Sequence, residues 1–210
     1  MIKSFKNNFE YINFITSVQL TDNEVMCTNF IPSSFFPKDI IDYFFDKKEN
    51  IPEHKLASEK LWNYGKQQQL KLKDNKIKFA FEFDSFNKFL EFGLVHEASK
   101  NFETSLSTRI AVVEKVISVI DNIFLITEPT PFVFRLIPTE TVIIDVDRNK
   151  SSQTIQGLVI QDKNLYDNFY SEFNRLTDLS EKLIPKNKLL DELVKAKQTL
   201  KNGTKTQLKI

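Results

Sequence analysis

The amino-acid sequence predicts an α+β fold, with a mixed α/β domain as the alternative. In several short segments apolar residues alternate at period two, which is typical of strands, and in several longer ones they recur every three or four residues, as in helices. Hairpin patterns come first, then helices, then a cluster of strands and two final helices. Because strands and helices are grouped in this way, the pattern favours the α+β class.

Two β-hairpins are predicted in the first half of the chain. Residues 9–31 alternate in polarity on both sides of Thr21-Asp22-Asn23, where Asp and Asn favour a turn. Residues 70–83 alternate on both sides of a polar turn at 73–76. Each hairpin is expected to place one apolar face on the core.

Helices are predicted between and after these hairpins. Pro37 and Pro52 stand at favourable first positions of two helices, the second of which is expected to end at Gly65. Two more helices are expected at 84–100 and 104–120, and Thr104 or Ser105 is the predicted N-cap of the later one.

Four short apolar runs open the second half and predict a cluster of four strands, at residues 123–127, 132–137, 142–146 and 155–160. Asp162 then caps a helix whose apolar stripe reaches Leu183, and Pro185 separates it from a final amphipathic helix. We expect one domain over residues 1–185, with a weak seam near 100–104, followed by a lysine-rich helix and tail over 186–210.

Composition limits the function. The chain has 210 residues, 41% of them hydrophobic, and a net charge of +1 that gives no global attraction to nucleic acid or acidic membranes. No signal peptide or membrane-spanning run is visible, since the apolar run 132–137 is short and contains Arg135. With a single cysteine, Cys27, these features predict a cytoplasmic location and no membrane partner. The four glycines stand alone, which excludes the Gly-rich dinucleotide-binding loop and the P-loop.

Few side chains suit an active site, so we assign no catalytic, cofactor-binding or metal-binding residue in the leading interpretation. Cys27, His54 and His96 are too few and too far apart in sequence for structural zinc, and Cys27 lies mid-strand as a packing residue. The alternative is a Mg²⁺-dependent phosphodiesterase or nuclease, because five carboxylates follow predicted strands and Mg²⁺ prefers such oxygens. These are Glu82, Asp84, Glu128, Asp145 and Asp147.

Two features suggest binding. Residues 181–210 hold eight lysines and three acidic residues, which raises nucleic-acid binding through this segment as a further alternative to a helix packed on the domain or on a second copy. Most of the twenty phenylalanines occupy core-type positions, and core packing is the default interpretation, but a few pairs exceed this need and could line an apolar ligand pocket or a protein interface. The pairs in question are Phe35-Phe36, Phe44-Phe45 and the group Phe86, Phe89 and Phe92.

Residues 105–183 resemble the phospholipase-D-like effector domain of TrmB-type archaeal transcription regulators. The similarity lies in a strand ending Ile143-Ile144-Asp145, a strand Gly157-Leu158-Val159-Ile160, and a long helix bearing Phe169 and Phe173. Enzymatic members of that group carry a His-x-Lys pair, whereas neither His54 nor His96 has lysine two residues on. The regulators also carry a DNA-binding winged helix, which the predicted hairpin at 9–31 does not match. The resemblance therefore implies a sensor domain without phosphodiesterase chemistry.

We accordingly predict a non-catalytic ligand-sensing or protein-interaction domain with a regulatory role. Its partner would be a protein or a small apolar ligand, and a homodimer could form through the C-terminal helix. No cofactor is expected.

Overall fold

The computed structural model describes residues 2–5, 8–28, 31–45, 52–93, 104–130, 133–145 and 157–209. It confirms the α+β class. Its strands are β1 (Ile2–Phe5), β2 (Glu24–Thr28), β3 (Ile77–Glu82), β4 (Ile123–Ile126), β5 (Val133–Ile137), β6 (Thr141–Asp145) and β7 (Gly157–Gln161). Its helices are α1 (Asn8–Ser17), α2 (Lys38–Phe45), α3 (Pro52–Lys73), α4 (Phe83–Phe92), α5 (Leu106–Ile117), α6 (Lys163–Leu183) and α7 (Lys186–Lys201), with short 3₁₀ turns at Ser33–Phe35 and Ile120–Asn122.

The strands form one mixed sheet in the order β1-β7-β6-β5-β2-β3-β4. Strands β2, β3 and β4 run parallel, whereas β5, β6 and β7 form an antiparallel meander whose first strand pairs with β2. The four apolar runs of the second half are β4 to β7, as the sequence predicts. Because of this topology, the carboxyl ends of β2, β3, β4 and β6 all lie at one edge of the sheet.

The first predicted hairpin is wrong, because its first half is helix α1 rather than a strand. Tyr11, Phe14, Ile15 and Val18 also fit one helical face, and this face packs on Ile137 and Ile143 of the sheet. The second half is a strand, β2, but it pairs in parallel with β3 instead of folding back on its predecessor. Short apolar segments fit both the helical period of about 3.6 residues and the strand period of two, so the sequence alone did not distinguish a helix from a strand here.

The second predicted hairpin is also wrong. Helix α3 continues through Gly65 to Lys73 and includes Leu70 and Leu72. Gly65 serves close packing: a Cβ there would lie 3.0 Å from the Cα of Ser34. The turn after Lys73 and the strand that follows it, β3, are as predicted, and Asn75 adopts a left-handed φ of 57° before β3 begins.

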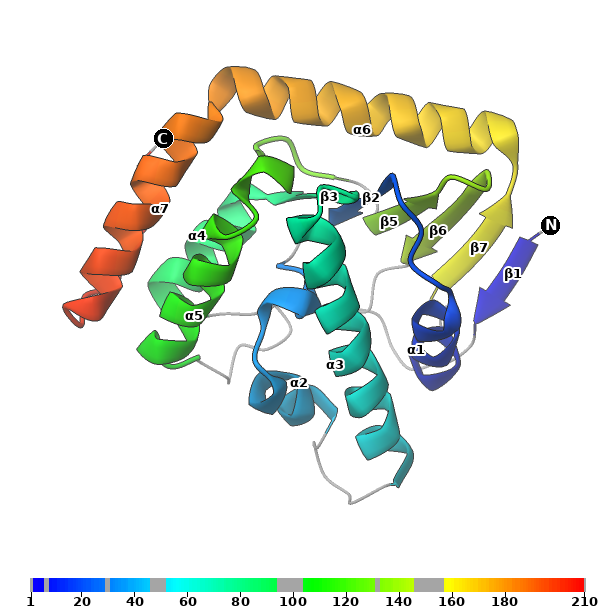
Figure 1. Ribbon diagram of the computed structural model, residues 1–210, viewed down its shortest axis with the longest axis horizontal. Coiled ribbons are helices and arrows are strands. Elements are labelled where there is room, and N and C mark those ends of the chain that lie inside the picture. Colours follow the sequence, from blue (N-terminus) through cyan, green and yellow to red (C-terminus); the bar gives the residue numbers. More distant parts are fainter. Residues whose placement is uncertain are drawn as a thin grey trace.

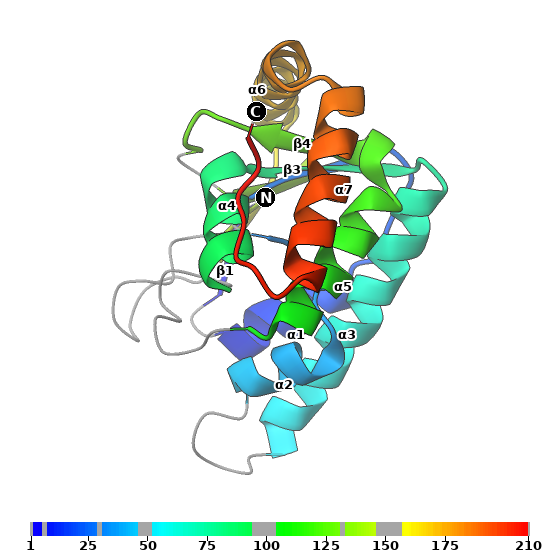
Figure 2. The same cartoon turned by 90° about the vertical axis from the view of Figure 1, so that its left-hand side faces the viewer.

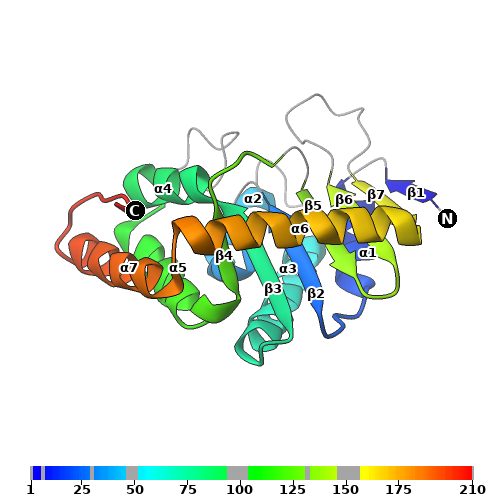
Figure 3. The ribbon, with the colours of Figure 1, turned by 90° about the horizontal axis from the view of Figure 1, so that it is seen from above.

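The sheet is covered unequally on its two faces. Among the described helices, α6 is the one that crosses one face of the sheet (Figures 1 and 3). Its Phe173 and Leu176 pack there on Cys27, Ala80 and neighbouring side chains. Along β3, Phe79 and Phe81 point to the opposite face, into the main core shared with α2, α3, α4, α5 and α7. None of the helices within the described ranges is both long and apolar enough to cross a membrane.

Most helix ends follow the predicted chemistry. Ser105 caps α5 by accepting a hydrogen bond from the Thr108 amide at 3.1 Å, and Asp162 caps α6 by accepting from the Leu165 amide at 2.8 Å. Helix α4 ends at Gly93, whose φ is 71°. Residues 94–103 lie outside the described residues. They include the rest of the predicted helix 84–100, most of the predicted seam at 100–104, and His96.

The leucine stripe of helix α7 packs against the core of its own chain. Leu189, Leu193 and Leu200 are buried in the main core, and Figure 2 shows α7 lying beside α5. A dimer through this stripe would have to break that packing, so a second copy would need another surface of the helix.

Candidate functional site

Glu82 and Asp145, two of the carboxylates predicted to bind a metal ion, lie far apart in the structure. Glu82 ends β3 and accepts hydrogen bonds from the amide of Thr130 at 3.0 Å and from its hydroxyl at 3.3 Å. Asp145 ends β6, which lies three strands away from β3 in the sheet. Since neighbouring strands lie about 4.8 Å apart, the two carboxylates are separated by about 14 Å, too far to share an ion.

The other predicted carboxylates do not close this gap. Glu128 forms an ion pair with Arg175 at 2.7 Å, Asp84 is exposed in the first turn of α4, and Asp147 lies outside the described residues. Within the parts of the chain that the structure describes, no group of three or more His, Cys, Asp or Glu side chains lies close enough to hold a metal ion.

Arg175 explains why these surface carboxylates do not suit acid–base chemistry. Its guanidinium also donates to Glu172 at 2.8 Å, so it bridges two carboxylates at the carboxyl edge of the sheet. This arginine lowers the pKa of Glu172 and keeps it ionised, and the two carboxylates raise the pKa of Arg175. The group is a solvated ion-pair network rather than a general acid.

Cys27 is unsuited to nucleophilic chemistry. It is fully buried in the middle of β2, and burial, followed by the charges of Glu82 and Glu172, raises the pKa of its thiol to about 12. The side chain of His54 and the whole of His96 lie outside the described residues.

The phenylalanine pairs mainly build the core. Phe35, Phe36, Phe86 and Phe89 are buried and contact one another or other core rings, whereas Phe92 is 44% exposed. The side chains of Phe44 and Phe45 lie outside the described residues. The described members of these pairs therefore leave only Phe92 as an open aromatic surface.

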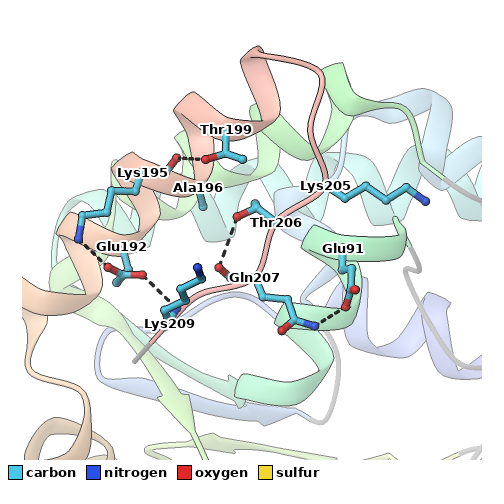
Figure 4. A pocket seen from close by; sticks show the side chains of 9 residues that line it. All are labelled: Glu91, Glu192, Lys195, Ala196, Thr199, Lys205, Thr206, Gln207 and Lys209. Carbon is cyan, nitrogen blue, oxygen red and sulfur yellow. Dashed lines mark hydrogen bonds and ion pairs between the residues drawn. The ribbon is translucent and has the colours of Figure 1, made fainter.

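A different site lies where the chain turns back after α7. Gly203, with a φ of 78°, ends the helix; its amide donates to the Leu200 carbonyl at 3.0 Å and the Thr204 amide donates to the Thr199 carbonyl at 3.2 Å. This is a Schellman turn, in which glycine supplies the left-handed residue. We call residues 203–209, which then run without regular structure toward α4, the strap (Figures 2 and 4).

The strap is held between α4 and α7 by a small set of contacts. Leu208 is 4% exposed and joins the main core. Its amide donates to Asn87 Oδ1 of α4 at 2.8 Å, and the amide of Lys209 donates to Glu192 Oε2 of α7 at 3.0 Å. The Gln207 side chain donates to Glu91 of α4. The two helices thus present acceptor side chains, and the strap supplies N–H donors.

Between the strap and the two helices lies a groove of about 550 Å³ (Figure 4). Its lining is polar and charged apart from one alanine: Glu91, Glu192, Lys195, Ala196, Thr199, Lys205, Thr206, Gln207 and Lys209. Its volume is in the range of ligand sites, which span about 300–1,000 Å³. The strap therefore leaves part of the available space unfilled.

Two charged side chains of the groove pair with each other. Glu192 forms an ion pair with Lys195 at 2.7 Å; this contact lowers the pKa of Glu192 and raises that of Lys195. Both groups are consequently charged at neutral pH. The polar groups that the described lining residues offer are charged carboxylates and ammonium groups, hydroxyls and an amide.

The strap itself is weakly anchored. Full burial of one leucine contributes about 2 kcal/mol, which is close to the entropic cost of ordering only one or two residues. Each of its exposed hydrogen bonds adds about 1 kcal/mol or less. Most residues of the strap are exposed, so we expect it to belong to the least stable part of the fold.

Sequence reasoning missed this site. It treated residues 202–210 as a tail, although Leu208 is an aliphatic residue between Gln207 and Lys209 and follows a glycine helix stop. Those two signals indicate a segment that folds back, but they do not say which helices receive it.

Comparison of the chain with protein-family models, with curated proteins and with solved structures found no match. The inferences below therefore rest on the residues and their arrangement.

Proposed function

We propose that this protein is a non-catalytic binding domain that receives a ligand or partner segment in the groove between α4, α7 and the strap. The observation that carries this proposal is the groove itself, of about 550 Å³, whose walls offer charged and hydrogen-bonding groups. A regulatory role and a cytoplasmic location belong to the same proposal. The location is supported by Cys27, a buried free thiol that suits a reducing compartment.

The order of elements supports the proposed kinship with phospholipase-D-like effector domains. Helix α5, strands β4 to β7 and the long helix α6 follow one another as that resemblance implies, with Asp145 ending β6 and Phe169 and Phe173 on α6. In this interpretation the domain is a sensor that has lost, or never had, the His-x-Lys chemistry.

The two alternative functions receive less support. Of the described carboxylates expected to hold Mg²⁺, Glu82 is engaged by Thr130 and Glu128 by Arg175, and Glu82 and Asp145 end strands that lie three positions apart in the sheet. Several lysines expected to contact nucleic acid face protein groups instead. Lys195 pairs with Glu192, Lys197 and Lys201 approach Glu114 at 3.8 and 3.9 Å, and the Lys186 ammonium lies 3.6 Å from the centre of the Phe124 ring.

Two titrations of the wild-type chain test the proposal. In the first, backbone amide chemical shifts are followed while short acidic, basic, neutral and apolar peptides are added one at a time. We expect at least one class to move amides at Glu91, Glu192, Thr199 and Thr206 together, because these residues line one groove. If no peptide moves them, or if shifts gather at the carboxyl edge of the sheet instead, the groove is not the binding site.

In the second titration, Mg²⁺ and Mn²⁺ are added in a calorimeter. We expect no saturable heat, and no difference between the wild type and Asp145→Ala. A saturable heat that Asp145→Ala abolishes would favour the metal-dependent enzyme over the binding domain.

A further inference from the structure

We infer that the strap, which forms one wall of the groove, is an internal competitor, and that the partner is a segment that takes its place between α4 and α7 with the same chemistry: one aliphatic side chain preceded by an amide and followed by a lysine. This inference rests on the proposed function and specifies its partner. The strap shows what the groove recognises, because it is itself an extended segment seated between two helices.

The recognition rules can be taken from the seated residues. Leu208 enters the main core, and the backbone amides of Leu208 and Lys209 reach Asn87 and Glu192. Gln207 reaches Glu91 with its side-chain amide. All three acceptors belong to α4 and α7, and two are carboxylates, so they favour a segment that presents N–H donors.

Displacement of the strap is physically reasonable. Only one of its side chains is buried, and the groove beside it keeps about 550 Å³ that the strap does not fill. A partner segment that seats the same aliphatic residue and also fills this space would make contacts that the strap lacks. The tethered strap acts at an effective concentration on the order of millimolar, so it would suppress weak segments and admit a better one.

Two full-length variants open the groove in different ways. Leu208→Asp prevents the strap from entering the core. Gly203→Ala leaves every groove residue and Leu208 unchanged but strains the turn, because an L side chain rarely adopts a φ of 78°. The added Cβ would meet nothing within 4 Å, so the substitution introduces no clash. Val194→Asp, at a position of α7 that is 47% exposed and outside the groove, is the matched control.

The probe is a fluorescent peptide with the sequence of residues 203–209, and its anisotropy is measured with each chain. We expect Leu208→Asp to bind it at least about tenfold more tightly than the wild type, because no cis competitor remains. Gly203→Ala should bind about fivefold more tightly, which is the effect of one strained left-handed residue. Val194→Asp should match the wild type, and the same peptide with aspartate in place of leucine should bind none of the chains.

Equal affinity of all four chains, or no binding by either Leu208→Asp or Gly203→Ala, would overturn the inference. A wild-type dimer in light scattering that Leu208→Asp converts to a monomer would overturn it as well, because the strap would then be exchanged between two copies. If this peptide fails while other peptides still shift the groove amides in the wild type, only this inference fails. If both fail, the proposed function fails with it.

Discussion

Arg135→Met is expected to lower the free energy of unfolding by about 3–5 kcal/mol, because it leaves a buried carboxylate without its cation. Glu24, at the start of β2, is fully buried, and its Oε2 accepts from Arg135 Nε at 2.7 Å. Its Oε1 accepts from the amide and hydroxyl of Thr21. Methionine approximates the length of the arginine stem, so packing against the Tyr64 ring, now 5.4 Å from the guanidinium, is partly retained.

Urea denaturation of the single and double variants checks this expectation. The double variant Glu24→Gln, Arg135→Met should recover much of the loss, since it removes both charges, and the remaining amide still has Thr21 as partner. Nη1 and Nη2 of Arg135 make no hydrogen bond within the described structure, so the wild-type pair is not fully satisfied. A loss below about 1 kcal/mol in Arg135→Met would show that Glu24 does not depend on this arginine.

Arg109→Met should have an effect of similar size, about 3–5 kcal/mol, for a different reason. Arg109 is 1% exposed and donates to the Leu90 and Glu91 carbonyls at 3.2 and 3.1 Å, and to the Thr104 carbonyl at 3.1 and 3.2 Å. The first two are carbonyls of the last turn of α4, which lack partners within the helix. Without the guanidinium, three carbonyl groups lose a buried donor.

The matched control for this variant is Arg175→Met. Arg175 is about half exposed, and although it bridges Glu128 and Glu172, such surface pairs contribute only about 0–1 kcal/mol. Both variants are compared by chemical denaturation at neutral pH. If they lose equal stability, then the buried contacts of Arg109 do not hold α4 in place. Because α4 carries Asn87 and Glu91, Arg109→Met should also loosen the strap.

The sequence predicted those features that depend on local chemistry. The caps at Ser105 and Asp162, the turn at residues 73–76, the strands β4 to β7 and the buried face of α7 all follow from residue type and spacing. The two hairpins were wrong because α1 and the last turn of α3 carry apolar residues that fit both periods, and long-range pairing of β2 with β3 decided between them.

The candidate site was less predictable. Glu82 and Asp145 were identified correctly as strand-end residues, whereas Asp84 lies in α4. The separation of Glu82 and Asp145 depends on strand order, which puts β2 and β5 between them. The strap depends on contacts between Leu208 and Asn87, which are far apart in the chain. Neither relation is encoded in a local pattern.

Native-state hydrogen exchange shows whether the strap beside the groove can leave its place while the rest of the protein stays folded. The amides of Leu208 and Lys209 are hydrogen-bonded to side chains of α4 and α7, whereas β3 lies inside the sheet, paired with β2 on one side and β4 on the other. We predict that the two strap amides exchange by local opening, with low protection that does not change when a little denaturant is added. Protection of these amides equal to that of β3, with the same dependence on denaturant, would mean that the strap opens only when the whole protein unfolds and would contradict the account.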